Sequence, residues 1–449
     1  MTARQLREHS VLKWFYPGMH IKRWLVLLLF GICLMGLGIA YVLKEAYLQT
    51  DLPGVFYYLT LQFIPRWGRG LLFMFLSLTT VGIATWKLNE SLLYAFVRPN
   101  QRDGNMAQAI YNKRFLSRGP KIVAIGGGTG LSTLLRGLKG YSSNLTAIVT
   151  VADDGGSTGR LRQEFGVVAP GDIRQCIAAL AEAEPLMSKL FQYRFTEGTG
   201  LEGHSFGNLF LVAMSEVTGN FETAIHEASR VLNVRGSILP STLEDVTLSA
   251  RTHEDEMVHG EHNITERGSA IRELFLNPAG AEAHPDAVRA ILEADLVVIG
   301  PGSLYTSVMP NLLVGGIQKA LMASDARRIF VCNVATQQGE TDGFTVADHL
   351  EALERHAGRG VIQAVVANNN IAETLPEVWH SSAVPVNRDG MAAFEHVRLV
   401  LADVVAEENR YRHDPEKLAA MVMRMYDHRD SLTNLATRHV VEEPLLIPR

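Results

Sequence analysis

The sequence predicts an α/β fold of the Rossmann-like type: a mostly parallel sheet with helices on both faces, preceded by a two-helix transmembrane hairpin. Three observations support this prediction. From residue 120 onward, short apolar runs rich in β-branched residues alternate with helix-length segments, which is typical of a parallel sheet that is buried on both faces. A glycine-rich turn joins the first of these runs to a helix. Two uncharged apolar stretches precede residue 100.

These observations divide the chain into four parts. Residues 1–99 hold the hairpin and its flanks, and 100–119 form a polar, basic linker. Residues 120–406 form the α/β domain, and 407–449 are expected to be a C-terminal helical extension.

The two apolar stretches of the hairpin are Trp24–Leu43 and Gly70–Trp86. The first is long enough for a helix that crosses the roughly 30 Å hydrocarbon layer of a membrane. Five basic residues precede it and six follow the second stretch up to residue 118, whereas only three lie between the two stretches. The positive-inside rule then places both termini and the α/β domain in the cytoplasm. The alternative, a cleaved signal peptide, fits less well because the first stretch is too long and no cleavage site follows it.

The α/β domain is expected to begin with a strand over Lys121–Ile125, a turn over Gly126–Gly130 and a helix over Leu131–Leu138. Glycines let a backbone approach an anion closely, and a helix N-terminus offers free N–H groups and a positive dipole end. The pattern is not a P-loop, and the third glycine of the dinucleotide fingerprint is replaced by a leucine. Gly127, Gly128, Thr129 and Gly130 are therefore candidates for binding phosphate, and a tight structural turn is the alternative.

A second strand is expected over Leu145–Val151, and the acidic loop Ala152–Arg160 follows it. Because ligands bind at the carboxyl ends of parallel strands, this loop should face the same crevice as the glycine turn. Asp153 and Asp154 could hold ribose hydroxyls or a hydrated Mg²⁺, which prefers oxygen ligands. Alternatively, the two aspartates cap a turn.

The middle of the domain is expected to be largely helical. Asp172 is the expected N-cap of a helix over Ile173–Glu182, and Gly203–Asn208 resembles a capped helix start that contains His204 and Asn208. His204 could act as an acid, a base or a phosphate donor, although a lone histidine is more often structural. Two further helices and a short β excursion are expected over Phe206–Val217, Phe221–Val231 and Val246–Arg251.

The α/β alternation resumes with three more strands, over Asp295–Gly300, Arg328–Asn333 and Val361–Val366. The loops after the first two of these strands carry Gly302, Ser303, Tyr305 and Asn333. Backbone N–H groups near Gly302 and Ser303 would suit a phosphate, and Tyr305 could stack on a base or sugar. The alternatives are a tight turn at Gly302 and a packed aromatic at Tyr305.

Composition limits the partners of the chain. With 449 residues, a net charge of −5 and 47% hydrophobic residues, the chain is neither disordered nor polycationic, so no nucleic-acid partner is expected. Cys33, Cys176 and Cys332 stand far apart in the sequence, which argues against a disulfide framework or a structural zinc site. Neither Cys176 nor Cys332 has the basic neighbours that would create a nucleophilic thiolate.

Six segments taken together resemble the gluconeogenesis factor family, which is related to the 2-phospho-L-lactate transferases. They are Lys121–Gly130, Ala152–Arg162, Pro170–Arg174, Gly203–Phe210, Gly300–Thr306 and Cys332–Asp342. The resemblance covers most of residues 120–406 and does not include the hairpin. It implies a Rossmann-like domain that binds a uridine diphosphate sugar such as UDP-GlcNAc around Gly127, Gly128, Thr129, Asp153, Asn208 and Tyr305. It also implies a regulatory role that links carbon metabolism to peptidoglycan precursor synthesis and cell shape.

Two functions remain in view. The favoured one is a non-catalytic regulator that passes ligand occupancy to a partner, such as an enzyme of amino-sugar synthesis. The other is a transferase of the 2-phospho-L-lactate type, with a guanosine diphosphate donor and Mg²⁺ held by Asp153 and Asp154. A nicotinamide dinucleotide site is a weaker third alternative, because the glycine fingerprint is broken. No cofactor other than Mg²⁺ is expected. The predicted partners, besides the ligand, are the membrane, which the two N-terminal helices would contact, and a second copy of the chain.

Overall fold

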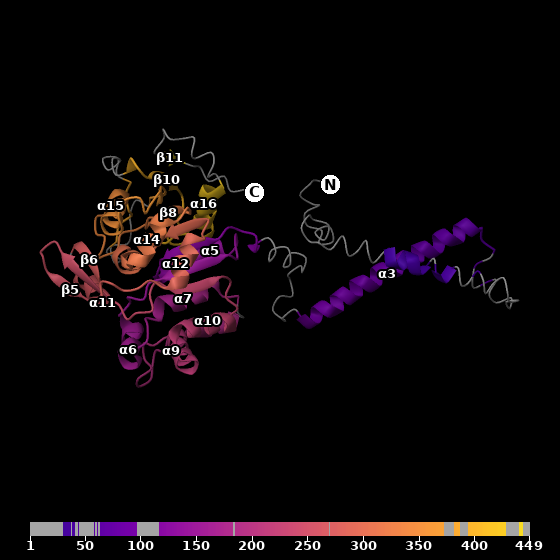
Figure 1. The fold of residues 1–449 in the computed structure, drawn as a ribbon, viewed down its shortest axis with the longest axis horizontal. Helices are drawn as coiled ribbons and strands as arrows, with labels where there is room; N and C mark the ends of the chain where they lie inside the picture. The colour runs from indigo at the N-terminus through magenta and orange to yellow at the C-terminus, as the bar shows by residue number, and fades with distance from the viewer. Residues whose placement is uncertain are drawn as a thin grey trace. The chain divides into compact units, whose positions relative to one another are not determined.

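The computed structural model forms two compact units, Met1–Arg114 and Phe115–Arg449 (Figure 1). The structure describes residues 30–36, 38–40, 44, 58, 61, 63–96, 116–182, 185–268, 270–371, 381–386, 394–427 and 440–442. Most of the predicted basic linker, 100–119, lies outside these residues.

The first unit contains the long helix α3 (Arg66–Phe96). The second predicted membrane span, Gly70–Trp86, falls inside this helix, whereas much of the first span, Trp24–Leu43, lies outside the described residues. Within the part of the chain that the structure describes, no helix combines the length and the apolar character needed to cross a membrane. The predicted transmembrane hairpin is therefore not supported by the structure.

The second unit is built around an eight-stranded sheet whose strands lie in the order β11-β10-β9-β8-β7-β1-β2-β3. Every neighbouring pair in this sheet is parallel. The strands are β1 (Ile122–Gly126), β2 (Leu145–Val149), β3 (Ser237–Pro240), β7 (Leu296–Ile299), β8 (Arg327–Val331), β9 (Ala364–Asn368), β10 (Arg398–Ala402) and β11 (Val440–Glu442). The predicted mostly parallel α/β sheet is confirmed.

The strand order reverses between β1 and β7. From β1 the chain proceeds outward to β2 and β3, returns to β7 beside β1, and then proceeds in the opposite direction to β8, β9 and β10. Right-handed crossovers in opposite directions place the connecting helices on opposite faces of the sheet. The carboxyl ends of β1 and β7 thus flank a topological switch point, where open α/β sheets bind their ligands.

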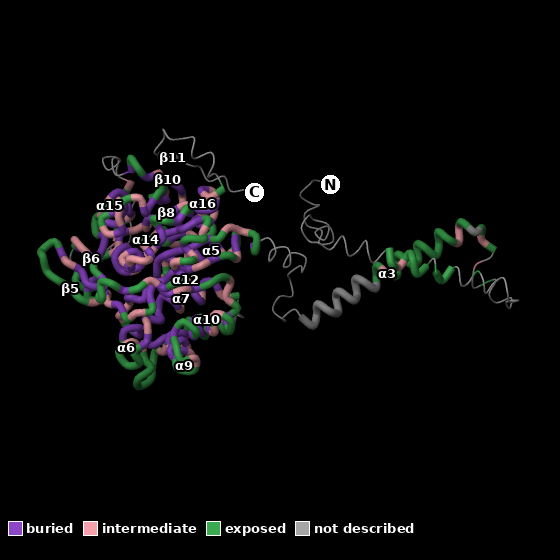
Figure 2. Tube along the Cα trace, viewed as in Figure 1, coloured by how far each residue is buried: buried purple, intermediate pink, exposed green. Residues whose placement is uncertain are grey.

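The central strands β1, β7 and β9 are buried along their whole length, and buried residues dominate the interior of this unit in Figure 2. The helices around the sheet pack in two groups. The first comprises α5 (Gly128–Leu138), α7 (Gly171–Leu180), α8 (Pro185–Gln192), α9 (Phe206–Thr218), α10 (Phe221–Val231) and α16 (Pro415–Asp427). The second comprises α12 (Pro285–Leu292), α13 (Met309–Leu313), α14 (Gly315–Ala323) and α15 (Val346–Ala357). The short helix α6 (Gly156–Phe165) contacts α9, and the π-helical turn η4 (Leu304–Val308) leads into α13.

The predicted β excursion is an antiparallel sheet in the order β5-β4-β6. Its strands are β4 (Thr247–Thr252), β5 (Met257–His259) and β6 (Ile271–Asn277), and helix α11 (Glu261–Arg267) lies between β5 and β6 in the chain. One cap was predicted wrongly: α7 begins at Gly171 after the N-cap Pro170, so Asp172 lies inside the first turn. Because its carboxylate accepts the backbone N–H of Gly128, Asp172 connects α7 to the glycine turn.

Candidate functional site

The glycine turn after β1 brings several backbones close together. Gly127 is the extended N-cap of α5, and Gly128 has φ +62°, in the left-handed region that favours glycine. A Cβ atom at Gly127 would lie 2.2 Å from a carboxylate oxygen of Asp172. A Cβ atom at Gly130 would lie 2.5 Å from the carbonyl oxygen of Pro301. These glycines therefore permit α5 to meet α7 on one side and the loop after β7 on the other.

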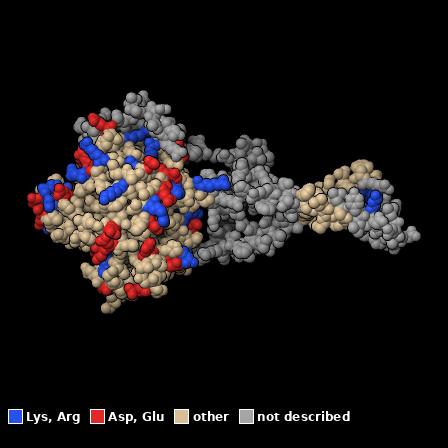
Figure 3. Space-filling view, in the orientation of Figure 1, with Lys and Arg blue, Asp and Glu red and all other residues tan. Residues whose placement is uncertain are grey.

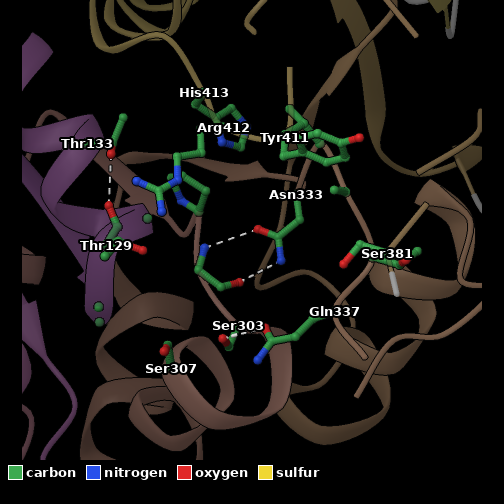
Figure 4. A pocket seen from close by; sticks show the side chains of 18 of the residues that line it. Thr129, Thr133, Ser303, Ser307, Asn333, Gln337, Ser381, Tyr411, Arg412 and His413 are labelled. Carbon is green, nitrogen blue, oxygen red and sulfur yellow. Dashed lines mark hydrogen bonds between the residues drawn. The ribbon is translucent and has the colours of Figure 1, made fainter. Parts of the chain in front are cut away.

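The loop after β7 is held by the loop after β8. The side chain of Asn333 accepts the backbone N–H of Gly302 at 3.2 Å and donates to its carbonyl oxygen at 2.8 Å (Figure 4). The hydroxyl of Ser303 donates to the side-chain carbonyl of Gln337. In turn, Gln337 donates at 2.8 Å to the carboxylate of Glu340, a residue only 2% exposed. Burial raises the pKa of Glu340 to about 7.

These loops enclose a pocket of about 600 Å³ at the carboxyl edge of the sheet (Figure 4). The volume is within the range of small-ligand sites. The pocket draws its walls from six separate parts of the chain. The lining residues are Gly127, Gly128, Thr129, Gly130, Thr133, Arg136, Gln175, Pro301, Gly302, Ser303, Ser307, Asn333, Val334, Ala335, Thr336, Gln337, Ser381, Tyr411, Arg412 and His413.

The charges in this pocket favour an anion. Its described lining residues include the arginines Arg136 and Arg412 but no carboxylate. His413 donates from Nε2 to the carbonyl oxygen of Cys332 at 3.2 Å, and burial lowers its pKa to about 4. At neutral pH the pocket thus presents two cations and an uncharged imidazole. On the face shown in Figure 3, acidic and basic side chains are interspersed.

Seven of the twelve residues that the sequence nominated as ligand-binding line the pocket. They are Gly127, Gly128, Thr129, Gly130, Gly302, Ser303 and Asn333. The other five, Asp153, Asp154, His204, Asn208 and Tyr305, are not among its lining residues.

The structure does not support stacking of Tyr305 on a ligand. Tyr305 is 1% exposed, and its ring makes edge contacts with Phe344 and His356 at centroid distances of 6.3 and 6.2 Å. Burial raises the pKa of its phenol to about 12. Tyr305 is therefore a packed aromatic, which was the alternative interpretation of the sequence. The tyrosine that lines the pocket is Tyr411.

The two aspartates of the acidic loop have different surroundings. The carboxylate of Asp154 accepts the backbone N–H groups of Glu261 and His262 at 3.1 and 2.9 Å, which secures the start of α11. Asp153 instead lies near Asp172: a Cβ atom on Gly171 would be 2.7 Å from a carboxylate oxygen of Asp153. Burial, followed by the charge of Asp153, raises the pKa of Asp172 to about 7. Asp153 and Asp172 therefore form an acidic pair that interacts through space, and the charge of Asp154 also raises the pKa of Asp153, after the larger effect of burial.

His204 and Asn208 belong to a buried polar network beside this acidic pair. Ser157 lies 3.0 Å from Nδ1 of His204 and accepts the side-chain amide of Asn208 at 3.1 Å. Asn208 in turn accepts Nε of Arg174 at 2.9 Å. Burial lowers the pKa of His204, so its ring is neutral near pH 7.

Sequence reasoning missed the residues that the C-terminal region contributes to the pocket. Tyr411, Arg412 and His413 lie between β10 and α16. One signal was available: Asp414 followed by Pro415 is typical of a helix start, and α16 does begin at Pro415. The basic and aromatic residues just before Pro415 could therefore have been assigned to a loop from the sequence.

The family model for 2-phospho-L-lactate transferase CofD matches residues 122–408 of the chain. This chain belongs to the CofD family. The match spans the strands and loops that build most of the pocket, and the resemblance to gluconeogenesis factors is confirmed as well. A Bacillus subtilis relative named gluconeogenesis factor is 45% identical over 312 residues, covering 68% of this chain and 97% of the relative.

Two further comparisons define how far the similarity extends. A Nostoc relative is 46% identical over 443 residues, covering 94% of this CofD-family chain and 95% of the relative. Since residues 120–449 make up less than three quarters of the chain, that similarity extends into the N-terminal unit. The X-ray crystal structure of a Bacillus halodurans protein superposes with a TM-score of 0.66 at 44% identity, covering 68% of this chain and all of that protein.

Proposed function

We propose that this chain is a gluconeogenesis factor that binds a nucleotide sugar of the UDP-GlcNAc type and regulates the supply of cell-wall precursors. The observation that carries the ligand class is the pocket at the switch point between β1 and β7. Its described lining combines a glycine turn at a helix N-terminus with two arginines and no carboxylate. A diphosphate suits such a site, because backbone N–H groups and arginine forks both donate to phosphate oxygens.

The remaining lining residues suit the neutral parts of a nucleotide sugar. Gln175 and Asn333 offer amide groups, Thr129 and Ser303 offer hydroxyls, and Tyr411 offers an aromatic ring. Sugars and bases are recognised by such convergent polar groups beside an aromatic surface. The relatives named gluconeogenesis factor support a role in carbon metabolism. A regulatory role of this kind requires that a partner bind the occupied and empty forms with different affinity.

Calorimetric titration of the full chain with UDP-GlcNAc tests this proposal. Replacing Arg412→Gln removes one of the two pocket cations and should weaken binding at least tenfold, or about 1.4 kcal/mol. Arg289→Gln is a matched control, because Arg289 pairs with Asp286 on α12 rather than lining the pocket. Equal affinity of the two variants, or no binding by the wild-type chain, would contradict the proposal.

A second candidate function, transfer of a phosphate-linked group as in the 2-phospho-L-lactate transferases, is favoured by the Asp153–Asp172 pair. No group of three or more histidines, cysteines or acids is arranged for a metal among the described residues. Two carboxylates completed by water nevertheless fit Mg²⁺, which usually keeps several waters. Bound there, Mg²⁺ would neutralise charge that develops on a phosphate.

Binding of guanosine diphosphate distinguishes the two candidates. A transferase should prefer it over UDP-GlcNAc, require Mg²⁺, and lose the metal dependence in Asp172→Asn. A regulator should bind UDP-GlcNAc without metal and show no turnover.

A further inference from the structure

A second polar centre lies outside the pocket and surrounds Arg174, on the first turn of α7. The aliphatic part of this side chain packs against Gly207, where a Cβ atom would lie 2.7 Å from Cδ of Arg174. Its Nε donates to Asn208, and its two terminal nitrogens have no hydrogen bond or ion pair with the residues that the structure describes. Arg174 is half-buried, so part of its surface is accessible to a ligand.

The buried network described above fixes the orientation of this guanidinium. Because Ser157 accepts the amide of Asn208, its own hydroxyl proton is directed to Nδ1 of His204. The amide of Asn208 is thereby fixed with its oxygen toward Nε of Arg174. Ser157, His204 and Asn208 are each no more than 5% exposed. A chain of satisfied, buried hydrogen bonds of this kind is rigid, and the proton of the neutral imidazole stays on Nε2.

Two other arginines lie close to this network. Arg160 donates to the carbonyl oxygen of Glu202 at 2.8 Å, and Arg194 donates to that of Gly203. Burial and then Arg194 lower the pKa of Arg174, while Asp172 and Asp153 oppose this shift. Arg160 and Arg194 also lower the pKa of His204, after the larger effect of burial. Arg160 and Arg194 thus add positive charge near Arg174, whose guanidinium has no carboxylate in contact among the described residues, although Asp172 and Asp153 act on it from farther away.

We propose that Arg174, supported by Arg160 and Arg194, binds an oxyanion of the phosphate class at a site separate from the nucleotide-sugar pocket. A fixed guanidinium whose two terminal nitrogens are free presents paired N–H donors that match the geometry of a phosphate. The orienting network reduces the entropy lost when the anion binds. Arg174 does not line the 600 Å³ pocket, and the proposal does not depend on the identity of the ligand there.

The position of Asp172 indicates how the two sites are related. Asp172 contacts the glycine turn of the pocket, and Arg174 lies two residues later on the same helix. Side chains two positions apart point to different sides of a helix. Asp172 and Arg174 therefore project from different sides of the first turn of α7, Asp172 toward the glycine turn and Arg174 toward Asn208.

Titration of the full chain with inorganic phosphate, followed by calorimetry, tests this site. Arg412→Gln is introduced first so that phosphate in the pocket does not contribute. In that background, adding Arg174→Gln should raise the Kd for phosphate at least tenfold, whereas adding Arg289→Gln should leave it unchanged. Arg174→Lys keeps the charge but loses the fork and the bond to Asn208, so it should weaken binding by an intermediate factor. Unchanged affinity in both Arg174 variants would overturn the proposal.

A direct measurement on the wild-type chain covers the case in which these variants fail to fold. Crystals soaked in selenate, a phosphate-shaped anion, should show an anomalous peak within hydrogen-bonding distance of the Arg174 guanidinium. A peak only beside Arg136 and Arg412, or none at all, would contradict the oxyanion site.

Repeating the titration with glycerol 2-phosphate identifies the source of the phosphate group. Binding of both probes indicates a phosphorylated metabolite, and binding of inorganic phosphate alone indicates the free ion. This result is independent of UDP-GlcNAc binding, so either proposal can fail alone.

Discussion

Replacing Gly130→Ala tests whether the close approach of two loops builds the pocket. The added methyl group would lie 2.5 Å from the carbonyl oxygen of Pro301 and 2.8 Å from Cα of Gly302. Optimal contact lies at roughly 3.5 Å, so α5 and the loop after β7 must separate by about 1 Å. Both obstructing atoms belong to the backbone, and no side-chain rotation can relieve the contact.

We expect this overpacking to cost about 1–3 kcal/mol of stability. It should also weaken UDP-GlcNAc binding at least tenfold, because the glycine turn and Gly302 form adjoining walls of one pocket. The matched control is Gly315→Ala in the first turn of α14, where no atom lies within 4 Å of the added methyl group. There alanine should be neutral or slightly stabilising through its helix propensity.

Urea unfolding and calorimetric binding of both variants provide the comparison. Gly130→Ala should unfold at lower urea and bind weakly, while Gly315→Ala should match the wild-type chain in both measurements. If the two variants have the same unfolding midpoint and the same Kd, the explanation of Gly130 by backbone contact is refuted.

Three further predictions concern stability. Leu135→Ala removes a fully buried side chain of α5 and should lower the free energy of unfolding in urea by about 2–5 kcal/mol. Its control, Leu186→Ala at a 77% exposed position, should change that free energy by less than about 0.5 kcal/mol. Burial raises the pKa of Glu340 from 4.5 to about 7, so between these pH values the folded state holds a proton that the unfolded state releases. The free energy of unfolding should therefore fall as pH rises from about 4.5 to 7. In Glu340→Gln the free energy of unfolding should depend less on pH in this window, and an unchanged slope would contradict the assignment. Thr345→Ala removes the capping box of α15 and should lower the thermal midpoint in scanning calorimetry, at a cost of about 0.5–2 kcal/mol; an unchanged midpoint would show that the cap contributes nothing.

The sheet could be predicted from the sequence because its strands are uninterrupted apolar runs. The run at Lys121–Ile125 became β1, and that at Asp295–Gly300 became β7. Some observed strand boundaries differ by a few residues from the predicted ones: the strand expected over Val361–Val366 is observed over Ala364–Asn368. Register with β8 and β10 determines that strand, and pairing partners are not encoded in the run itself.

The candidate site was less predictable because it depends on contacts between distant segments. The glycines of the turn could be found, since their spacing after a strand has a local cause. Tyr305 could not be distinguished from a ligand-stacking aromatic, because its burial depends on Phe344 and His356. Asp172 was read as a helix cap, although its carboxylate accepts the N–H of Gly128, more than forty residues earlier.

The contact between α5 and α16 connects the two ends of the α/β unit at the pocket. A Cβ atom at Gly137 would lie 1.9 Å from the carbonyl oxygen of Pro415, so the start of α16 rests directly on α5. Arg412 and His413 precede that start, and Arg136 precedes Gly137 on α5. A diphosphate that binds both arginines would therefore tie these two helices together. At a concentration of 100 times its Kd, such a ligand stabilises the folded state by about 2.7 kcal/mol. Transmission of occupancy to a partner requires in addition that the ligand bind one folded conformation more tightly than another, and a contact that joins α5 to the segment before α16 can supply that difference.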